Sequence, residues 1–321
     1  MTGGAGYIGS VVARQLLGSG HEVVVLDSLA RGHRGAIPRA CEHLAVDLLD
    51  AAATLRALAG GYDGVLHFAA LALVAESVEH PERYWHNNVL GTRHLLDAMR
   101  AHGVGRLVFS STCAVYGEPA RVPMDERIGT APVNAYGASK LAVDLMLADE
   151  CRAHGLAATS LRYFNVAGTS GDAGEHHDPE THVIPLLLQA ATGRRARFSV
   201  FGTDYPTPDG TAIRDYIHVE DLGDAHLLAL DALSAGRHEI YNLGNGTGFS
   251  VRQVVAAAER VVGRPIPTRD EPRRPGDPPQ LVAASDKIRA ELGWEPRKPR
   301  LETMIADAWE WAQAHPDGYG D

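Results

Sequence analysis

Short apolar runs alternate with amphipathic stretches through the first half of the chain. The run "HEVVVLD" (21–27) predicts a buried strand, and "GVLHFAA" (64–70) and "RLVFSST" (106–112) predict two more. "SVVARQLLGSG" (10–20) has the apolar spacing of a helix and ends in glycines. Strands that are apolar on both faces and alternate with helices are typical of a parallel sheet covered on both sides. We therefore predict an α/β fold, with a Rossmann-like doubly wound sheet over residues 1–167.

The second half has a different pattern. Pro, Gly, Asp and His are frequent in 168–185 and again in 202–222, and helix-like pieces are separated by long loops. A chain of 321 residues is long for a single core. We expect a smaller α+β substrate-binding domain over residues 168–321, with some of its segments packing back on the first domain.

The composition of the chain limits the classes of partner that it can bind. The chain is 45% hydrophobic and carries a net charge of −10 without a run of Lys or Arg, which argues against nucleic acid and against an anionic membrane. The longest apolar stretch is too short to span a bilayer. The chain has only three cysteines, widely spaced, at Cys41, Cys113 and Cys151. This pattern is typical of free thiols in a reducing compartment. We predict a cytoplasmic protein.

Histidines are numerous but scattered. His176, His177 and His182 lie near Asp178, yet no H-x-x-x-H or C-x-x-C spacing accompanies them. We interpret them as loop histidines and expect no metal site.

The chain opens with glycines at dinucleotide-binding spacing. "MTGGAGYIGS" contains Gly3-x-x-Gly6-x-x-Gly9, and a helix pattern follows. Small residues let the backbone approach a pyrophosphate, and the helix N-terminus offers unpaired N–H groups. The next strand ends in Asp27, eighteen residues past Gly9, where an acidic residue binds the adenosine ribose and favours NAD. Arginines follow this aspartate closely in the sequence, so NADP, the 2′-phosphorylated form of the cofactor, remains an alternative.

The strand that should precede the glycines is missing. Such a loop normally follows about five apolar residues, but only Met1 and Thr2 precede Gly3. Because that strand is central in a doubly wound sheet, we expect the natural sequence to begin a few residues upstream.

A tyrosine and a lysine lie four positions apart in "NAYGASK" (134–140). Side chains at this spacing share one face of a helix, and the pair alone fits a solvated helical turn equally well. Beside a nicotinamide cofactor the pair could act as a catalytic base. The Lys140 ammonium and the positively charged nicotinamide ring would both lower the pKa of Tyr136 from about 10 towards neutrality. Ser110, Ser111 and Thr112 end a predicted strand, where ligands of such sheets bind.

These motifs together resemble a known family. "TGGAGYIG", "SST" ahead of "VYG", and "YGASK" are similar to the extended short-chain dehydrogenases/reductases. "LRYFNVAG", "HDPETHVIP", "DYPTPDGTAIRDYIHVEDL", "YNLGNG" and "RRPGDPP" resemble, within them, the UDP-glucose 4-epimerases (UDP-galactose 4-epimerases). The match runs essentially end to end, lacking only the first strand.

The resemblance implies a reaction at C4 of a UDP-hexose. Tyr136 would take the proton of the sugar 4-hydroxyl while hydride passes to NAD, Lys140 would hold the nicotinamide ribose and keep Tyr136 acidic, and Thr112 would hydrogen-bond the same oxygen. The 4-keto sugar would then turn over and be reduced from its other face, which interconverts UDP-glucose and UDP-galactose.

The resemblance also implies binding residues. The expected cofactor contacts are Gly3, Gly6, Tyr7, Ile8, Gly9, Asp27, Asp47, Leu48, Phe68, Ala69, Ala70, Asn87, Tyr136, Lys140 and Tyr163. The expected UDP-sugar contacts are Thr112, Asn165, His182, Phe201, Arg214, Arg274 and Asp277. The two arginines suit a diphosphate, with which guanidinium groups form charge-assisted hydrogen bonds. Members of the family are commonly homodimers that pair two helices from each subunit, and 89–103 and 136–155 are plausible contributors.

Three positions depart from the family pattern. Ala72 replaces a lysine near the cofactor, and His182 stands where some members have asparagine. Leu281 stands where some members have a tyrosine that crowds the C2 substituent of the sugar, so N-acetylated UDP-sugars would also fit.

Alternative functions follow from the same fold. Epimerases of UDP-N-acetylhexosamines or of pentoses share every catalytic residue. A nucleotide-sugar dehydratase needs an acid and a base beside Thr112, but Cys113 and Ala114 occupy those places. A non-catalytic dinucleotide-binding regulator would be expected to have lost Tyr136 or Lys140.

Overall fold

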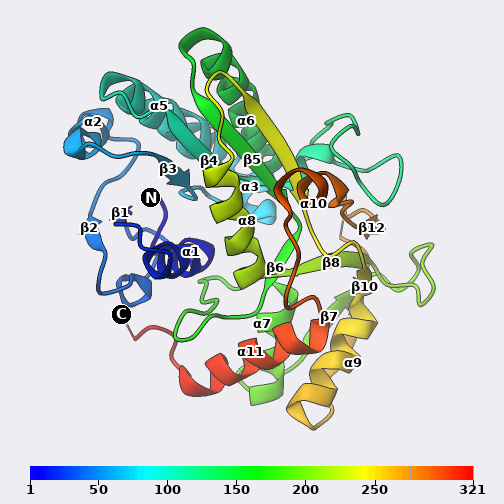
Figure 1. The fold of residues 1–321 in the computed structure, drawn as a ribbon. Helices are drawn as coiled ribbons and strands as arrows, with labels where there is room; N and C mark the ends of the chain where they lie inside the picture. The colour runs from blue at the N-terminus through cyan, green and yellow to red at the C-terminus, as the bar shows by residue number, and fades with distance from the viewer. Residues whose placement is uncertain (275, 321) are drawn as a thin grey trace.

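A parallel β-sheet covered by helices on both faces forms the first half of the protein (Figure 1). The computed structural model describes residues 1–274 and 276–320. Four strands pair in parallel, in the order β3-β4-β5-β9, and β1 pairs in parallel with β2. These strands are β1 (Val24–Leu26), β2 (Glu42–Leu44), β3 (Val65–His67), β4 (Arg106–Thr112), β5 (Ala157–Tyr163) and β9 (His238–Leu243). The predicted doubly wound α/β fold is confirmed.

Each face of this sheet has its own apolar core. One face is covered by α1 (Tyr7–Gly18) and α8 (Val219–Asp231), which pack with Val25, Val108 and Leu161 of the strands. The other is covered by α2 (Ala51–Ala57), α5 (Gly91–Ala101) and α6 (Ala135–His154). Because the strands are buried on both sides, they are the near-continuous apolar runs that predicted them.

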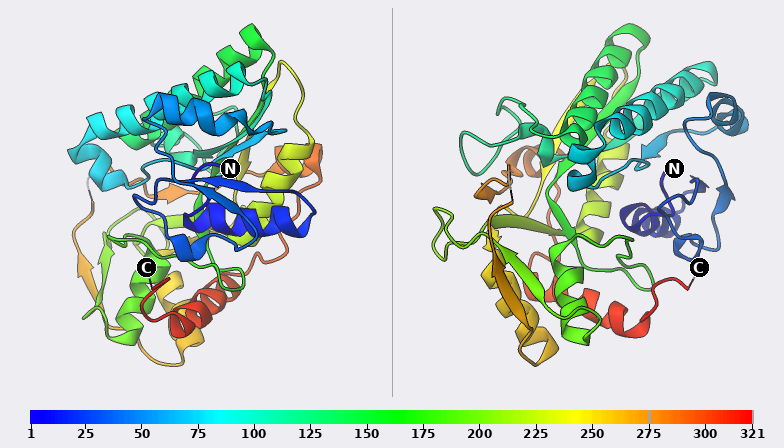
Figure 2. Two further views of the ribbon diagram at one scale, coloured as in Figure 1. Left: turned by 90° about the vertical axis from the view of Figure 1, so that its left-hand side faces the viewer. Right: turned by 180° about the vertical axis from the view of Figure 1, so that it is seen from behind.

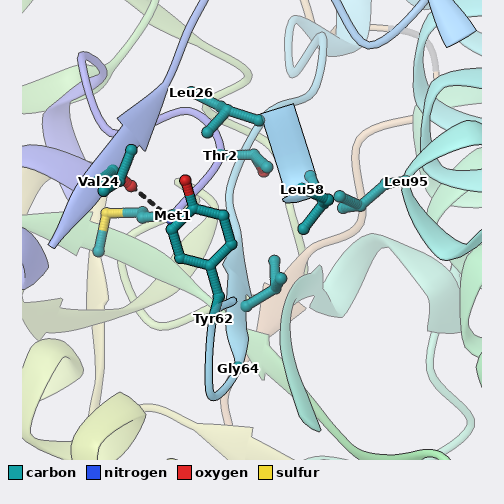
Figure 3. A pocket seen from close by; sticks show the side chains of 9 residues that line it. Met1, Thr2, Val24, Leu26, Leu58, Tyr62, Gly64 and Leu95 are labelled. Atoms are coloured by element: carbon teal, nitrogen blue, oxygen red, sulfur yellow. Dashed lines mark hydrogen bonds between the residues drawn. The ribbon is translucent and has the colours of Figure 1, made fainter. Parts of the chain in front are cut away.

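Met1 and Thr2 join the two parts of the sheet. Thr2 forms parallel bridges with both Leu26 of β1 and His67 of β3, and its amide donates to the Leu66 carbonyl at 3.0 Å. The central position of the sheet is thus held by a bridge of one residue, beside a small pocket lined mainly by the apolar side chains around Val24 and Leu26 (Figure 3).

The second half builds a smaller mixed sheet and a third core. In that sheet β6 (Asn165–Ala167) and β12 (Gln280–Leu281) lie parallel to β8 (Ile213–His218), and β10 (Gly248–Ser250) lies antiparallel to it. A separate parallel pair consists of β7 (Phe198–Phe201) and β11 (Thr268–Glu271). The helices of this core are α7 (Val183–Thr192), α9 (Val251–Val262) and α11 (Leu301–Ala314), grouped at one end of the molecule in Figure 2.

The two halves of the sequence are interleaved in space. Strand β9 and helix α8 come from the second half, yet β9 extends the first sheet beside β5 and α8 packs against α1. The remaining short helices are α3 (Val74–Glu79), α4 (Pro81–Tyr84) and α10 (Asp286–Leu292), and one π-helical turn, η3, covers Trp85–Leu90. None of the helices in the described residues has the length and apolar character needed to cross a membrane.

A buried ion pair fixes α6 against the sheet. The Asp144 carboxylate of α6 accepts hydrogen bonds from Arg162 of β5 at 2.8 and 3.1 Å, and both side chains are at most 5% exposed. Arg162 also donates to the Tyr116 hydroxyl at 3.0 Å. Removing one partner of such a pair leaves the other charge buried and unpaired, away from water.

We predict that Asp144→Ala lowers the free energy of unfolding by about 3–5 kcal/mol, because it leaves the Arg162 guanidinium buried and unpaired. Urea denaturation of the two proteins measures this. Asp149→Ala is the matched control, since Asp149 pairs with Arg152 on the exposed side of the same helix, where such pairs contribute about 0–1 kcal/mol. Equal losses in both variants would contradict the prediction.

Candidate active site

Thr112 and Tyr136 meet where β4 ends and α6 begins. Thr112 is the last residue of β4, and its hydroxyl accepts from the Ala114 amide at 3.2 Å, which caps the turn that follows. Asn134 caps α6 by accepting from the Gly137 amide at 2.8 Å, so Tyr136 stands in the first turn of the helix. Thr112 lies near enough to the Tyr136 phenol to lower its pKa. Strand end and helix start therefore bring the two hydroxyl side chains near one another.

Lys140 lies one helical turn beyond Tyr136, on α6 as predicted. Its side chain is buried, and Nζ donates to the Ser110 carbonyl of β4 at 2.7 Å, 4.7 Å from the centroid of the Phe109 ring. Burial lowers the pKa of the Lys140 ammonium to about 7, which the Asp144 carboxylate opposes. Lys140 is therefore buried and bound to the end of β4. The alternative interpretation of the Tyr136–Lys140 pair, a solvated helical turn on the surface, does not hold.

The pKa of Tyr136 is raised in the protein alone, whereas the expectation drawn from the sequence concerns Tyr136 beside a bound nicotinamide ring. Burial raises this pKa to about 12, and the nearby Thr112 side chain only partly opposes this rise. In the protein alone, desolvation of the phenolate outweighs any stabilisation by Lys140, whose ammonium is held by Ser110. Further positive charge beside the phenol would shift the pKa downwards.

The glycine loop lies between β1 and β3 and leaves no room for a side chain at Gly3 or Gly9. A Cβ on Gly3 would come within 2.4 Å of the Ala69 amide nitrogen, and one on Gly9 within 2.3 Å of the Gly3 carbonyl oxygen. At Gly6, by contrast, it would meet only that oxygen, at 3.4 Å. Helix α1 starts at this point without a side-chain cap, so its positive end faces the loop.

Asp27 organises the same loop. One carboxylate oxygen accepts from the Ala5 amide and the other from the Leu29 amide, each at 2.9 Å. Leu29 has a positive φ of 58°, so the chain turns sharply away after β1. The arrangement is that of a phosphate cradle with an acidic residue at its rim.

The other expected cofactor residues sit on neighbouring strand ends. Phe68, Ala69 and Ala70 follow β3, and Asp47 and Leu48 follow β2. Two tyrosines join these strands to the segments beside them. The Tyr163 hydroxyl donates to Ser110 Oγ, and the Tyr7 hydroxyl donates to the Gly168 carbonyl at 2.6 Å.

Asn88 is a site residue that the sequence reasoning missed. Its buried amide binds both the N–H and the C=O of Leu71 and donates to Ser139 of α6 at 3.0 Å, while Asn87 donates to it at 2.9 Å. It thereby fixes the loop after β3 against α6. The signal was the adjacent pair "NN", of which only Asn87 was selected.

The expected substrate residues form two groups. Arg214 of β8 is paired with Asp277, and the Arg274 guanidinium lies 3.9 Å from the centroid of the Phe201 ring. Arg214 also lowers the pKa of Cys113, the neighbour of Thr112, although burial raises that pKa more, to about 12. Leu281 pairs in register with Arg214 and packs on the apolar cluster that contains Cys113, so Arg214 lies near the end of β4.

The second group lies in the segments after β5. Asn165 of β6 pairs in register with Tyr216 of β8 and lowers the pKa of its phenol, although burial raises that pKa more. His182 precedes α7, and its Nδ1 faces two carboxylates, those of Glu175 at 2.8 Å and Glu180 at 3.0 Å.

The chain is similar to proteins of one enzymatic class along its whole length. Residues 1–244 match the family model "NAD dependent epimerase/dehydratase family". A UDP-glucose 4-epimerase of Corynebacterium glutamicum is 54% identical over 98% of this chain and 95% of its own. One of Streptomyces lividans is 54% identical over 100% and 98%. A crystal structure of UDP-glucose 4-epimerase from Bifidobacterium longum, in complex with NAD+ and UDP, is 36% identical with a TM-score of 0.94, covering 99% of this chain and 98% of its own.

Proposed function

This chain belongs to the NAD-dependent epimerase/dehydratase family, and we propose that it interconverts UDP-glucose and UDP-galactose by inverting C4 of the hexose. The observation that carries the proposal is the junction of β4 with α6, which brings Thr112 near the Tyr136 phenol and buries Lys140 one turn away, with its Nζ on the Ser110 carbonyl. Relatives that are 54% identical over the full chain and are named for this reaction support it.

NAD is the cofactor, and the glycine loop fits it. A Cβ at Gly3 or Gly9 would collide with backbone, while Gly6 borders open space at the uncapped start of α1. The loop amides and the α1 N-terminus would hold the pyrophosphate, and Asp27 would hold the adenosine ribose. Bound NAD supplies a reversible acceptor for the C4 hydride. Asp47, Leu48, Phe68, Ala69 and Ala70 would line the same cleft, with Asn87 and Tyr163 nearer the nicotinamide.

The proton chemistry belongs to the side chains at the end of β4. Tyr136 takes the proton of the sugar 4-hydroxyl and returns it after the sugar has turned. Thr112 hydrogen-bonds the same oxygen and keeps it facing the phenol. Lys140 positions the nicotinamide ribose, and its contact with the Ser110 carbonyl holds the ammonium in place while it does so.

Substrate binding falls to the residues around β8. Arg214 and Arg274 would neutralise the diphosphate, Phe201 would pack on the uridine side, and Asp277 orients Arg214. Asn165 begins β6 and His182 directly precedes α7; both would complete the UDP-sugar site, His182 through Nε2, because its Nδ1 faces Glu175 and Glu180.

We further propose that the protein is a cytoplasmic homodimer. Cys41, Cys113 and Cys151 are all free thiols, which suits a reducing compartment. Apolar side chains are exposed on α3, η3 and α6, which pack on one another: Val78 is 65% exposed, Trp85 45%, Leu90 37% and Leu145 62%. We name these four residues the apolar face, and a patch of this kind is typical of a subunit interface.

Tyr136→Phe should reduce kcat about 10²–10⁴-fold, the usual contribution of a general acid or base. The measurement is conversion of UDP-galactose to UDP-glucose in a coupled assay. Denatured Tyr136→Phe protein should release as much NAD as the wild type, which shows that the pocket is intact. Unchanged turnover in this variant would refute the proposed function.

Leu281 is the position that should decide tolerance of an N-acetyl group. Leu281 lies on β12 in register with Arg214, and its side chain packs with Cys113 and Phe164 beside the catalytic strand end. We expect measurable turnover of UDP-N-acetylglucosamine by the wild type and a loss of at least about tenfold in kcat/KM for it in Leu281→Tyr, equivalent to about 1.4 kcal/mol. UDP-galactose turnover should change little, as it should for both substrates in the control Leu281→Met. Wild-type protein without activity on UDP-N-acetylglucosamine would contradict this.

Leu145→Glu should convert the dimer to monomers, because it places a charge on α6, against which both α3 and η3 pack, and so within the apolar face. Light scattering coupled to size-exclusion chromatography measures the mass. Leu55→Glu is the control, since Leu55 is an exposed leucine (43%) on α2, away from that face, and should leave the dimer intact. A monomeric wild type, or a dimeric Leu145→Glu, would show that the interface lies elsewhere or does not exist.

A further inference from the structure

Two Glu-x-His pairs face one another in the segment that leads from β6 to α7. Glu175 and His177 form the first pair, Glu180 and His182 form the second, and a bend at 178–179 separates them. In an extended chain, residues two apart point to the same side. The bend therefore turns the two pairs towards one centre. The sequence expectation of unconnected loop histidines does not describe this arrangement.

We propose that Glu175, His177, Glu180 and His182 form a binding site for one divalent transition-metal ion, with Zn²⁺ as the best match. Each residue offers one ligand atom, and the four atoms lie within 4.8 Å of one another. Two imidazole nitrogens and two carboxylate oxygens suit Zn²⁺, whereas Mg²⁺ and Ca²⁺ prefer sites made only of oxygen.

Bonds of about 2.0–2.2 Å to zinc place tetrahedral ligands about 3.3–3.6 Å apart. His182 Nδ1 lies 2.8 Å from Glu175 Oε1 and 3.0 Å from Glu180 Oε1. His177 Nδ1 lies 3.4 Å from Glu175 Oε1 and 3.6 Å from the other Glu180 oxygen, Oε2. The four groups are close enough for one ion, and side-chain shifts of about 1 Å would bring four ligand atoms to tetrahedral separations.

The pairing within the cluster also favours a metal over ion pairs alone. His177 Nδ1 is buried, and within the described residues it makes no hydrogen bond of normal geometry. A histidinium in an ion pair approaches a carboxylate to about 2.7–2.9 Å; His182 meets this distance at Glu175, whereas His177 stays at 3.4 Å or more from both carboxylates. The carboxylates of Glu175 and Glu180 are only 10% and 6% exposed, so their two negative charges need compensation. In the metal-free protein the two imidazoles supply it as cations, and a divalent ion would supply it in their place.

The surrounding structure orients the cluster and gives it a place in the fold. Glu180 accepts from the amides of Thr181 and His182, at 2.7 and 2.8 Å, which fixes its carboxylate. Arg31, which follows β1, donates to the Asp178 carbonyl at 2.7 Å. The Tyr7 ring, in the first turn of α1, stands edge-on to His177 with centroids 6.5 Å apart. A bound ion would therefore fasten this segment beside the dinucleotide loop.

Metal uptake by the full-length protein, free of any affinity tag, tests the proposal. The chelator-treated protein is incubated with Zn²⁺, desalted and measured for metal per chain by mass spectrometry. We expect one equivalent in the wild type, retained in an excess of Mg²⁺. His177→Ala and Glu180→Gln should each weaken Zn²⁺ binding at least tenfold. His154→Ala, which removes an exposed histidine at the end of α6, should bind as the wild type does.

Co²⁺ provides a readout that does not depend on the variants. Wild-type protein loaded with Co²⁺ should show the visible absorption of a four-coordinate complex with nitrogen and oxygen ligands, and Zn²⁺ should displace it. Wild-type protein that retains no metal after desalting, or equal uptake in the wild type and His177→Ala, would overturn the proposal. Because neither measurement uses turnover, failure here and failure of the proposed epimerase activity are distinguishable.

Discussion

The hydrogen bond from Lys140 to the Ser110 carbonyl joins the two elements on which the active site depends. It links α6 to the carboxyl end of β4, and the Asp144–Arg162 pair holds the same helix one turn further along. Tyr136 and Thr112 owe their proximity to this docking, because one stands in the first turn of α6 and the other at the end of β4. A helix displaced by a single turn, about 5 Å, would separate the two hydroxyls altogether.

The interleaving of the two sequence halves explains how substrate residues reach this junction. Strand β9 and helix α8 return to the first sheet, and α8 directly follows β8, which carries Arg214. The second half is therefore anchored to the first through the sheet itself rather than through a flexible linker. Residues far apart in sequence, such as Cys113 and Arg214, come close enough for the arginine to affect the thiol pKa.

Local patterns in the sequence predicted what is local in the structure. "RLVFSST" became β4 without a change of bounds, and the Tyr136–Lys140 spacing became one helical turn. Features that depend on distant partners were not predictable. Thr2 bridges both β1 and β3, and the Glu-x-His pairs converge only because the chain bends between them. Asn88 was passed over because its partners, Leu71 and Ser139, lie 17 and 51 residues away.

Because the pKa of Tyr136 is raised, proton transfer by this residue depends on whether oxidised NAD occupies the cleft. In the protein alone, burial holds the phenol at a pKa of about 12, so it is a poor base at neutral pH. The Lys140 ammonium is itself poised near 7 and is held by a carbonyl. Added positive charge in the cleft favours the phenolate, and oxidised NAD carries such a charge on its nicotinamide ring. The same burial that keeps the phenol protonated in the protein alone amplifies the effect of a nearby cation, because the local dielectric is low. The phenolate is therefore most populated when a hydride acceptor is present.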